Sequence, residues 1–178
     1  MSIIQEIKRA EAVSLSNDDL LVLTNNKVNI LTYEELEDAK NIDEVLGINE
    51  AAIILYQTQS DYGHWVSLFK VNDTTLEFFD SLGWKVDQEL KFSKYSLRVH
   101  KGEEVPHLSH LIEQSNYKLI QNTDKLQKNA RDDSTCGRWS GLRIRLRDMP
   151  LKKFVELFTK TKEFEPDFWV SALTILFS

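Results

Sequence analysis

The sequence predicts an α+β fold, in which a central, mostly antiparallel sheet packs against a helix that begins at Cys136. Three observations lead to this class. The run 51–57 is apolar, as in a strand that is covered on both faces. Two further strand-like runs, 64–71 and 75–80, enclose the turn-forming residues 72–74 and predict a hairpin. Apolar residues then recur at helical spacing near the C-terminus, which adds flanking helices.

The first fifty residues predict short helices with recognisable caps. Ser16 is followed by two acidic residues and is typical of a helix N-cap. Thr32 and Glu35 match a capping box, in which each side chain satisfies a backbone N–H group at the helix start. Gly47 is typical of a helix end. In chain order, these signals predict a short helix from 16 through 23, a strand over 27–31, a helix over 33–40 and a helical turn over 42–46.

The second half of the chain predicts further strands and four helices. Pro106, Pro150 and Pro166 each stand near an expected helix start, where proline is tolerated because the first N–H groups have no helical partner. In chain order, the expected elements are a strand over 94–99, a helix over 105–114, a polar strand over 117–127, and helices over 139–147, 151–162 and 167–177.

Composition limits the classes of function. The 178 residues suit one domain, 1–178, and a net charge of −6 argues against general nucleic-acid binding. The local exception is a basic set that we interpret as a solvated helix face. No apolar run approaches a membrane span, and the N-terminus does not resemble a signal peptide. The basic set consists of Arg138, Arg143, Arg145, Arg147, Lys152 and Lys153.

The single cysteine, Cys136, excludes an internal disulfide and a multi-cysteine zinc site. If Ser134 or Asp133 caps the following helix, Cys136 lies in its first turn. Unpaired N–H groups and the helix dipole there favour an anion, and the thiolate is the reactive form of cysteine. The alternative is a small buried apolar residue without chemistry.

The predicted hairpin brings His64 toward Asp80. A loop centred on Asn72 would place the two side chains directly opposite on one face, and a loop centred on Asp73 would make them diagonal neighbours on that face. A loop with an even number of residues would place the two side chains on opposite faces of the hairpin. A carboxylate that orients an imidazole, beside a cysteine, gives the base and nucleophile that cysteine hydrolases use.

An oxyanion site requires further donors. The Cys136 backbone N–H supplies one, and an upstream side-chain amide supplies the other. Gln127 is the preferred candidate because it ends the predicted strand before the cysteine loop. Gln121 is the alternative, and Asn129 is a weaker one.

These residues resemble a known family in their order. The chain has Gly63-His64-Trp65, then Phe78-Phe79-Asp80-Ser81-Leu82, then a glutamine upstream of Thr135-Cys136-Gly137. This pattern is similar to that of the adenain and SUMO-protease superfamily of cysteine peptidases. The Thr-Cys-Gly-Arg form looks most like the capsid-maturation proteases of double-stranded DNA viruses and virophages. The resemblance covers residues 51 to about 147.

The resemblance implies a thiol endopeptidase that cleaves viral capsid precursors at glycine-containing sites during virion maturation. In that family, a Cys–His–Asp triad acts with a glutamine, which here implies Cys136, His64, Asp80 and Gln127. Trp65 and Gly137 would bind substrate in a narrow groove. The implied locations are the virion and the virus factory in the host cytoplasm. The rival expectations are a SUMO- or ubiquitin-like-protein deconjugase and an inactive assembly protein of the same fold.

Two departures from the family pattern bear on the mechanism. Gln127 is nine residues before Cys136, whereas the family places its glutamine six or seven residues before. A second cysteine is absent, so an activating peptide cannot be joined through a disulfide, while DNA or a non-covalent peptide stays open. No metal or cofactor is expected, because His107 and His110 have no third ligand at suitable spacing.

Overall fold

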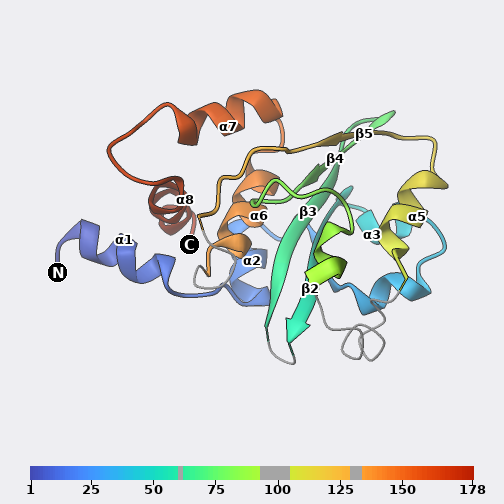
Figure 1. Cartoon of the computed structure of the whole chain (residues 1–178), viewed down its shortest axis with the longest axis horizontal. Helices are drawn as coiled ribbons and strands as arrows, with labels where there is room; N and C mark the ends of the chain where they lie inside the picture. The colour runs from blue at the N-terminus through green and yellow to red at the C-terminus, as the bar shows by residue number, and fades with distance from the viewer. Residues whose placement is uncertain (60–61, 93–104, 129–133) are drawn as a thin grey trace.

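The computed structural model describes residues 1–59, 62–92, 105–128 and 134–178, and it confirms the α+β class (Figure 1). Across these residues the sheet has the order β1-β2-β3-β4-β5. The two central pairings are antiparallel, and the pairings that add β1 and β5 at the edges are parallel, so the sheet is mixed. The strands are β1 (Asn29–Thr32), β2 (Ala51–Gln59), β3 (Tyr62–Asn72), β4 (Thr75–Phe79) and β5 (Lys118–Gln121).

Helices cover both faces of the sheet (Figure 1). On one face, α3 and α5 bury apolar side chains against residues such as Ile54 and Val66. On the other face, α2 and α6 pack against Ile53 and Phe69. Neighbouring residues of a strand thus serve opposite cores, as the two-residue period of a strand requires. The helices are α1 (Ile3–Glu11), α2 (Asn17–Leu23), α3 (Ile42–Leu46), α5 (His107–Glu113), α6 (Cys136–Arg145), α7 (Leu151–Thr159) and α8 (Pro166–Ile175), with 3₁₀ helices η1 (Glu34–Asp38) and η2 (Gln88–Phe92).

Several local predictions are confirmed in the N-terminal part. Ser16 caps α2 through a complete capping box, and Gly47 ends α3 with φ at +62°. The helix expected over 33–40 is wrong in type and length, because only the short 3₁₀ helix η1 forms there. Thr32 donates its N–H and hydroxyl to Glu35, but no first-turn N–H is capped in return.

The C-terminal part differs from prediction mainly at element boundaries. The polar strand expected over 117–127 ends at Gln121, and the following residues run as a loop toward α6. Helix α5 begins after Pro106 rather than around it. The strand expected over 94–99 lies outside the described residues. Among the described helices, none is long and apolar enough to cross a lipid bilayer.

A buried ion pair fixes α6 against the sheet. Arg143 donates to both carboxylate oxygens of Glu77 on β4, at 2.7 and 3.0 Å, and the two side chains are 1% and 2% exposed. The guanidinium also donates to two backbone carbonyls, those of Leu146 and Met149. Because α6 begins at Cys136, this contact sets the helix against the strand that leads to the site described below.

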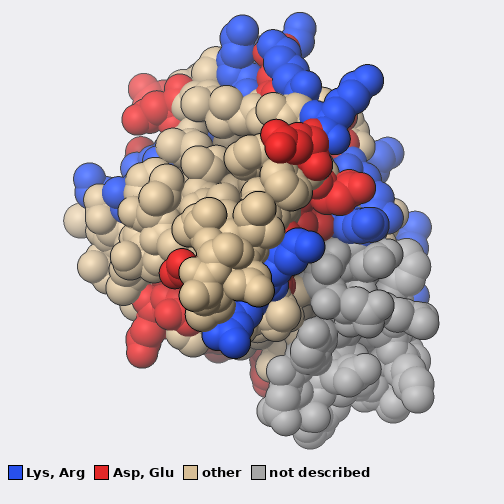
Figure 2. Space-filling model, turned by 90° about the vertical axis from the view of Figure 1, so that its left-hand side faces the viewer, with Lys and Arg blue, Asp and Glu red and all other residues tan. Residues whose placement is uncertain are grey.

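Helices α1 and α8 contact each other and lie beyond α6, away from the sheet (Figure 1). The face seen in Figure 2 has a broad area of uncharged residues, with Lys, Arg, Asp and Glu gathered mainly toward its margins. Several large apolar side chains of α1 and of the α7–α8 region are exposed. They are Ile3, Ile4, Leu157 and Leu176.

Candidate active site

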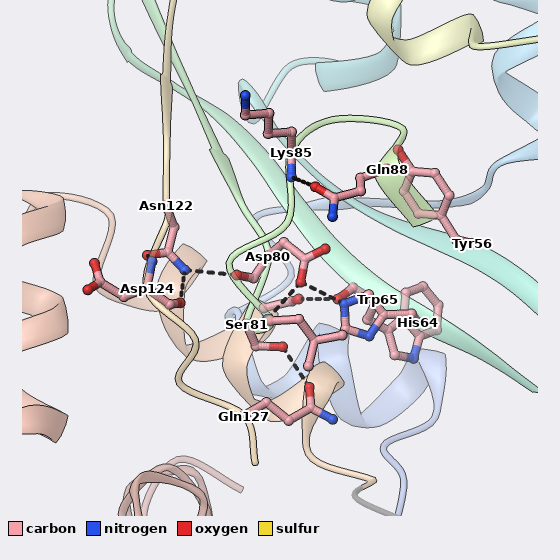
Figure 3. A network of polar contacts seen from close by, with 12 residues as sticks. Tyr56, His64, Trp65, Asp80, Ser81, Lys85, Gln88, Asn122, Asp124 and Gln127 are labelled. Carbon is pink, nitrogen blue, oxygen red and sulfur yellow. Dashed lines mark hydrogen bonds and ion pairs between the residues drawn. The ribbon is translucent and has the colours of Figure 1, made fainter. Parts of the chain in front are cut away.

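The structure brings His64 and Asp80 together. Asp80 Oδ1 accepts a hydrogen bond from His64 Nε2 at 2.9 Å, and both side chains are buried (Figure 3). The hairpin pairs Ser67 with Phe79 and Lys70 with Leu76, so the loop is centred on Asp73. The two residues are therefore diagonal neighbours, and the directly opposite pairing is wrong.

Asp80 can contact the His64 imidazole because β4 ends just before Asp80. By the observed register the partner of His64 would be Leu82, but β4 ends at Phe79, so His64 lies past the end of its neighbouring strand. Asp80 turns back there, since its Oδ1 also accepts from the Leu82 N–H at 2.8 Å. Its carbonyl accepts from the Asn122 side chain at 2.8 Å (Figure 3). Two donors thus hold Oδ1 of the carboxylate, and Asn122 holds the backbone of the same residue.

Cys136 is the first residue of α6, as the sequence predicts, and its exposed fraction is 9%. Thr135 occupies the N-cap position but makes no side-chain cap bond, so the predicted cap by Ser134 is wrong, and Asp133 lies outside the described residues. Burial lowers the pKa of His64, but the Asp80 carboxylate and a side-chain hydrogen bond with Cys136 together raise this pKa well above its ordinary value of 6.5. Cys136 and Asp80 therefore act on the same imidazole.

The Asp-Ser-Leu motif also fixes Gln127. Ser81 Oγ donates to the side-chain oxygen Oε1 of Gln127 at 2.7 Å. The backbone N–H of Gln127 donates to the backbone carbonyl of Ser81 at 2.9 Å. The hydroxyl thereby determines which end of the amide faces Ser81, with the NH₂ group at the other end (Figure 3). Gln121 instead accepts from the Val86 N–H at 3.1 Å. Asn129 lies outside the described residues.

Trp65 and Gly137 occupy the contact between β3 and α6. A Cβ atom on Gly137 would lie 3.3 Å from Trp65 Cδ1, so the absence of a side chain lets the helix approach closely. The Trp65 carbonyl accepts from Ser140 Oγ at 3.0 Å, and Trp65 as a whole residue is 9% exposed. Both residues contribute to packing beside Cys136.

Three side chains, two of which belong to this site, could together hold a metal ion. In the described residues, single ligand atoms from His64, Asp80 and Glu89 lie within 4.8 Å of one another, and all three residues are buried. An imidazole with two carboxylates suits a divalent cation such as Zn²⁺. The sequence did not indicate Glu89, because its place in η2 shows no ligand spacing.

The basic set near Cys136 is not one solvated face. Arg138 and Arg143 are buried, so the interpretation as an exposed helix face is wrong for both. Each of the four arginines donates to specific protein oxygens rather than lying free on a surface. Besides the contacts of Arg143, these are Arg138 to Ala10 O and Thr174 Oγ1, Arg145 to Leu23 O, and Arg147 to Asn49 O.

Sequence reasoning missed Asp167, whose buried carboxylate contacts both segments of the site. It accepts hydrogen bonds from Thr135, Trp139 and Lys128. In the sequence, an acid directly after Pro166 is indistinguishable from an ordinary helix-start residue, which favours the dipole and nothing more. Only the tertiary packing of α8 beside α6 reveals its partners.

Comparison with known proteins assigns the chain to a family. No protein-family model matches the chain. The crystal structure of the ASFV pS273R protease aligns with a TM-score of 0.49 and 12% identity, over 93% of this chain and 68% of that chain. A likeness at that level does not bear on function. The uncharacterized protein V9 of Sputnik virophage is 38% identical over 174 residues, which cover 96% of this chain and 99% of the relative. The chain therefore belongs to the same family as V9 of Sputnik virophage.

Proposed function

We propose that the protein is a cysteine endopeptidase with Cys136 as nucleophile, His64 as base and then acid, and Asp80 as the group that orients His64. The observation that carries this proposal is the buried imidazole, which Asp80 holds through Nε2 and on which Cys136 also acts. A raised His64 pKa favours transfer of the thiol proton to the ring, which leaves a thiolate for attack.

These groups and one water molecule are sufficient for peptide-bond hydrolysis. The thiolate adds to the scissile carbonyl carbon, and the carbonyl electrons move to oxygen. Gln127 and the Cys136 N–H stabilise that oxyanion. The imidazolium then donates its proton to the leaving amine as the C–N bond breaks. His64 then deprotonates a water molecule, which attacks the thioester carbon. The C–S bond breaks, which releases the carboxylic acid product and regenerates the Cys136 thiolate.

The proposed substrates are viral capsid precursors, cut at glycine-containing sites during virion maturation. The virophage origin of the 38% identical relative supports a viral substrate. Action would take place in the virion and in the virus factory of the host cytoplasm. The lone cysteine excludes a disulfide-linked activating peptide. Arg138 and Arg143 near Cys136 already bond protein oxygens, which leaves fewer cationic groups for DNA, while activation by DNA or by a non-covalent peptide stays part of the proposal.

The direct test is incubation of the purified protein with unprocessed capsid proteins of Sputnik virophage, followed by mass spectrometry of the products. Defined cleavage by the wild-type protein, absent with Cys136→Ala, is expected. A SUMO or ubiquitin fusion serves as a parallel substrate, and its exclusive cleavage would instead indicate a deconjugase. If neither substrate class is cut, the inactive assembly protein is favoured and the proposal fails.

A further inference from the structure

Asp167, in the first turn of α8, accepts hydrogen bonds from three separate donors within the part of the chain that the structure describes. Its Oδ1 accepts from Thr135 Oγ1 and from Trp139 Nε1, each at 2.7 Å. Its Oδ2 accepts from the Lys128 backbone N–H at 2.8 Å. The residue is 6% exposed. A buried carboxylate needs such donors, because it has lost its hydration.

Two of these donors connect the Asp167 carboxylate to the proposed oxyanion site. Lys128 directly follows Gln127, and Thr135 directly precedes Cys136. The two oxygens of one rigid, planar group therefore hold the two chain segments that supply the proposed oxyanion donors. The stretch from β5 toward α6 runs beside α8 in Figure 1, in keeping with these contacts.

We propose that Asp167 is a positioning residue that sets the separation between the Gln127 amide and the Cys136 N–H. This inference rests on the proposed function. An oxyanion site works only when its donors lie about 2.7–3.1 Å from the developing charge, and a displacement of about 1 Å can cost roughly 100-fold in rate. The same carboxylate accepts from Lys128, the neighbour of Gln127, and from Thr135, the neighbour of Cys136. A nine-residue Gln–Cys spacing is then compatible with a defined site.

The start of α6 supports this role. Thr135 stands at the N-cap, where a threonine hydroxyl normally accepts from a first-turn N–H. Here the hydroxyl donates to Asp167, and no side-chain cap bond forms. Thr135 therefore orients the helix start toward α8 and does not occupy the first-turn N–H groups of the helix that begins at Cys136.

The test variant is Asp167→Asn, which keeps the shape of the side chain. If its amide oxygen continues to accept from Thr135 and Trp139, its NH₂ group faces the Lys128 N–H, and two donors oppose each other. The substitution thus releases the Gln127 segment in particular. Glu165→Gln is the matched control, because Glu165 precedes the same helix and lies 3.9 Å from the Lys128 ammonium, yet is exposed.

Two assays separate positioning from a general structural role. Hydrolysis of a fluorogenic peptide ending in Gly-Gly gives kcat and KM. Alkylation of Cys136 by iodoacetamide gives the reactivity of the thiol, and it develops no oxyanion because the attacked carbon is saturated. For Asp167→Asn we expect kcat to fall about 10- to 100-fold, with KM within about twofold. Alkylation should keep its rate and pH profile, and Glu165→Gln should match wild type in both assays.

A double variant tests whether Asp167 acts through Gln127. Once Gln127→Ala is present, adding Asp167→Asn should lower kcat by less than about twofold, since the two changes remove the same interaction. Thr135→Val serves as a second variant if Asp167→Asn does not fold, and it should show a smaller loss in kcat of the same kind.

Each remaining outcome overturns the inference in a recognisable way. Unchanged hydrolysis by Asp167→Asn, with an active wild-type enzyme, would refute positioning and leave the proposed function intact. Parallel loss of alkylation and hydrolysis would indicate a general structural role. A wild-type protein that is alkylated but hydrolyses neither the peptide nor the capsid proteins would remove the proposed function, and this inference with it.

Discussion

Replacing Ser81 by alanine should weaken catalysis without touching the nucleophile. The Ser81 hydroxyl donates to Gln127 Oε1 at 2.7 Å, and the two residues are 0% and 1% exposed. Taking a donor from a buried carbonyl oxygen costs about 1–3 kcal/mol. The same bond sets the orientation of the amide, and a flipped amide would present its oxygen to the oxyanion. Loss of a preference of about 1.4 kcal/mol corresponds to about a tenfold change in that orientation.

We therefore expect Ser81→Ala to lower kcat about 3- to 30-fold, less than the roughly 10²- to 10³-fold loss expected for Gln127→Ala. The free energy of unfolding, measured in urea, should fall by about 1–3 kcal/mol. Ser115→Ala is the matched control, because its hydroxyl bonds the Ile112 carbonyl at the end of α5. Peptide hydrolysis gives the kcat values. Wild-type kcat in Ser81→Ala would refute the assigned role of the Ser81–Gln127 bond.

Four further predictions follow from the buried ionisable groups. Asp80→Asn should lower kcat roughly 10²- to 10⁴-fold, as loss of an orienting carboxylate does. The pKa of His64 is raised in the folded state, so the stability from its charge is full below its ordinary value of 6.5 and lost as the pH rises through the raised value. The difference in unfolding free energy between wild type and Asp80→Asn should therefore shrink with rising pH, and a constant difference would contradict this. Glu77→Ala should cost about 3–5 kcal/mol of unfolding free energy, because it leaves the Arg143 charge buried, and Glu77→Leu with Arg143→Met should recover part of that loss in the same urea assay. Zn²⁺ should inhibit hydrolysis reversibly, and Glu89→Gln should raise the required concentration at least about threefold; equal inhibition of both proteins would exclude Glu89 as a ligand.

The hairpin shows how far local patterns predict the site. The turn residues 72–74 fixed the strands and put His64 and Asp80 on one face, because side chains alternate with a period of two. They did not determine the loop centre, since a bulge between Lys70 and Asn72 shifts the register. The predicted contact between His64 and Asp80 is nevertheless confirmed, because an imidazole and a carboxylate can also meet as diagonal neighbours.

Features that depend on tertiary packing could not be predicted in this way. The acid of Asp167 and the arginines of α6 show ordinary helical spacing, and only their buried partners distinguish them from surface residues. The capping box at Thr32 predicted a helix start correctly but not its 3₁₀ form. Helix α1 was not predicted, although Ser2 and Gln5 form a capping box that the sequence contains.

The most direct test of the central claim measures Cys136 alkylation by iodoacetamide across the pH range, in wild type and in His64→Ala. If the imidazole accepts the thiol proton, wild type should react at least about tenfold faster than His64→Ala near about pH 6, and the two rates should converge in alkaline solution. Equal rates at acid pH would show that Cys136 reacts as an isolated thiol, and the proposed relay of sulfur, imidazole and carboxylate would be wrong.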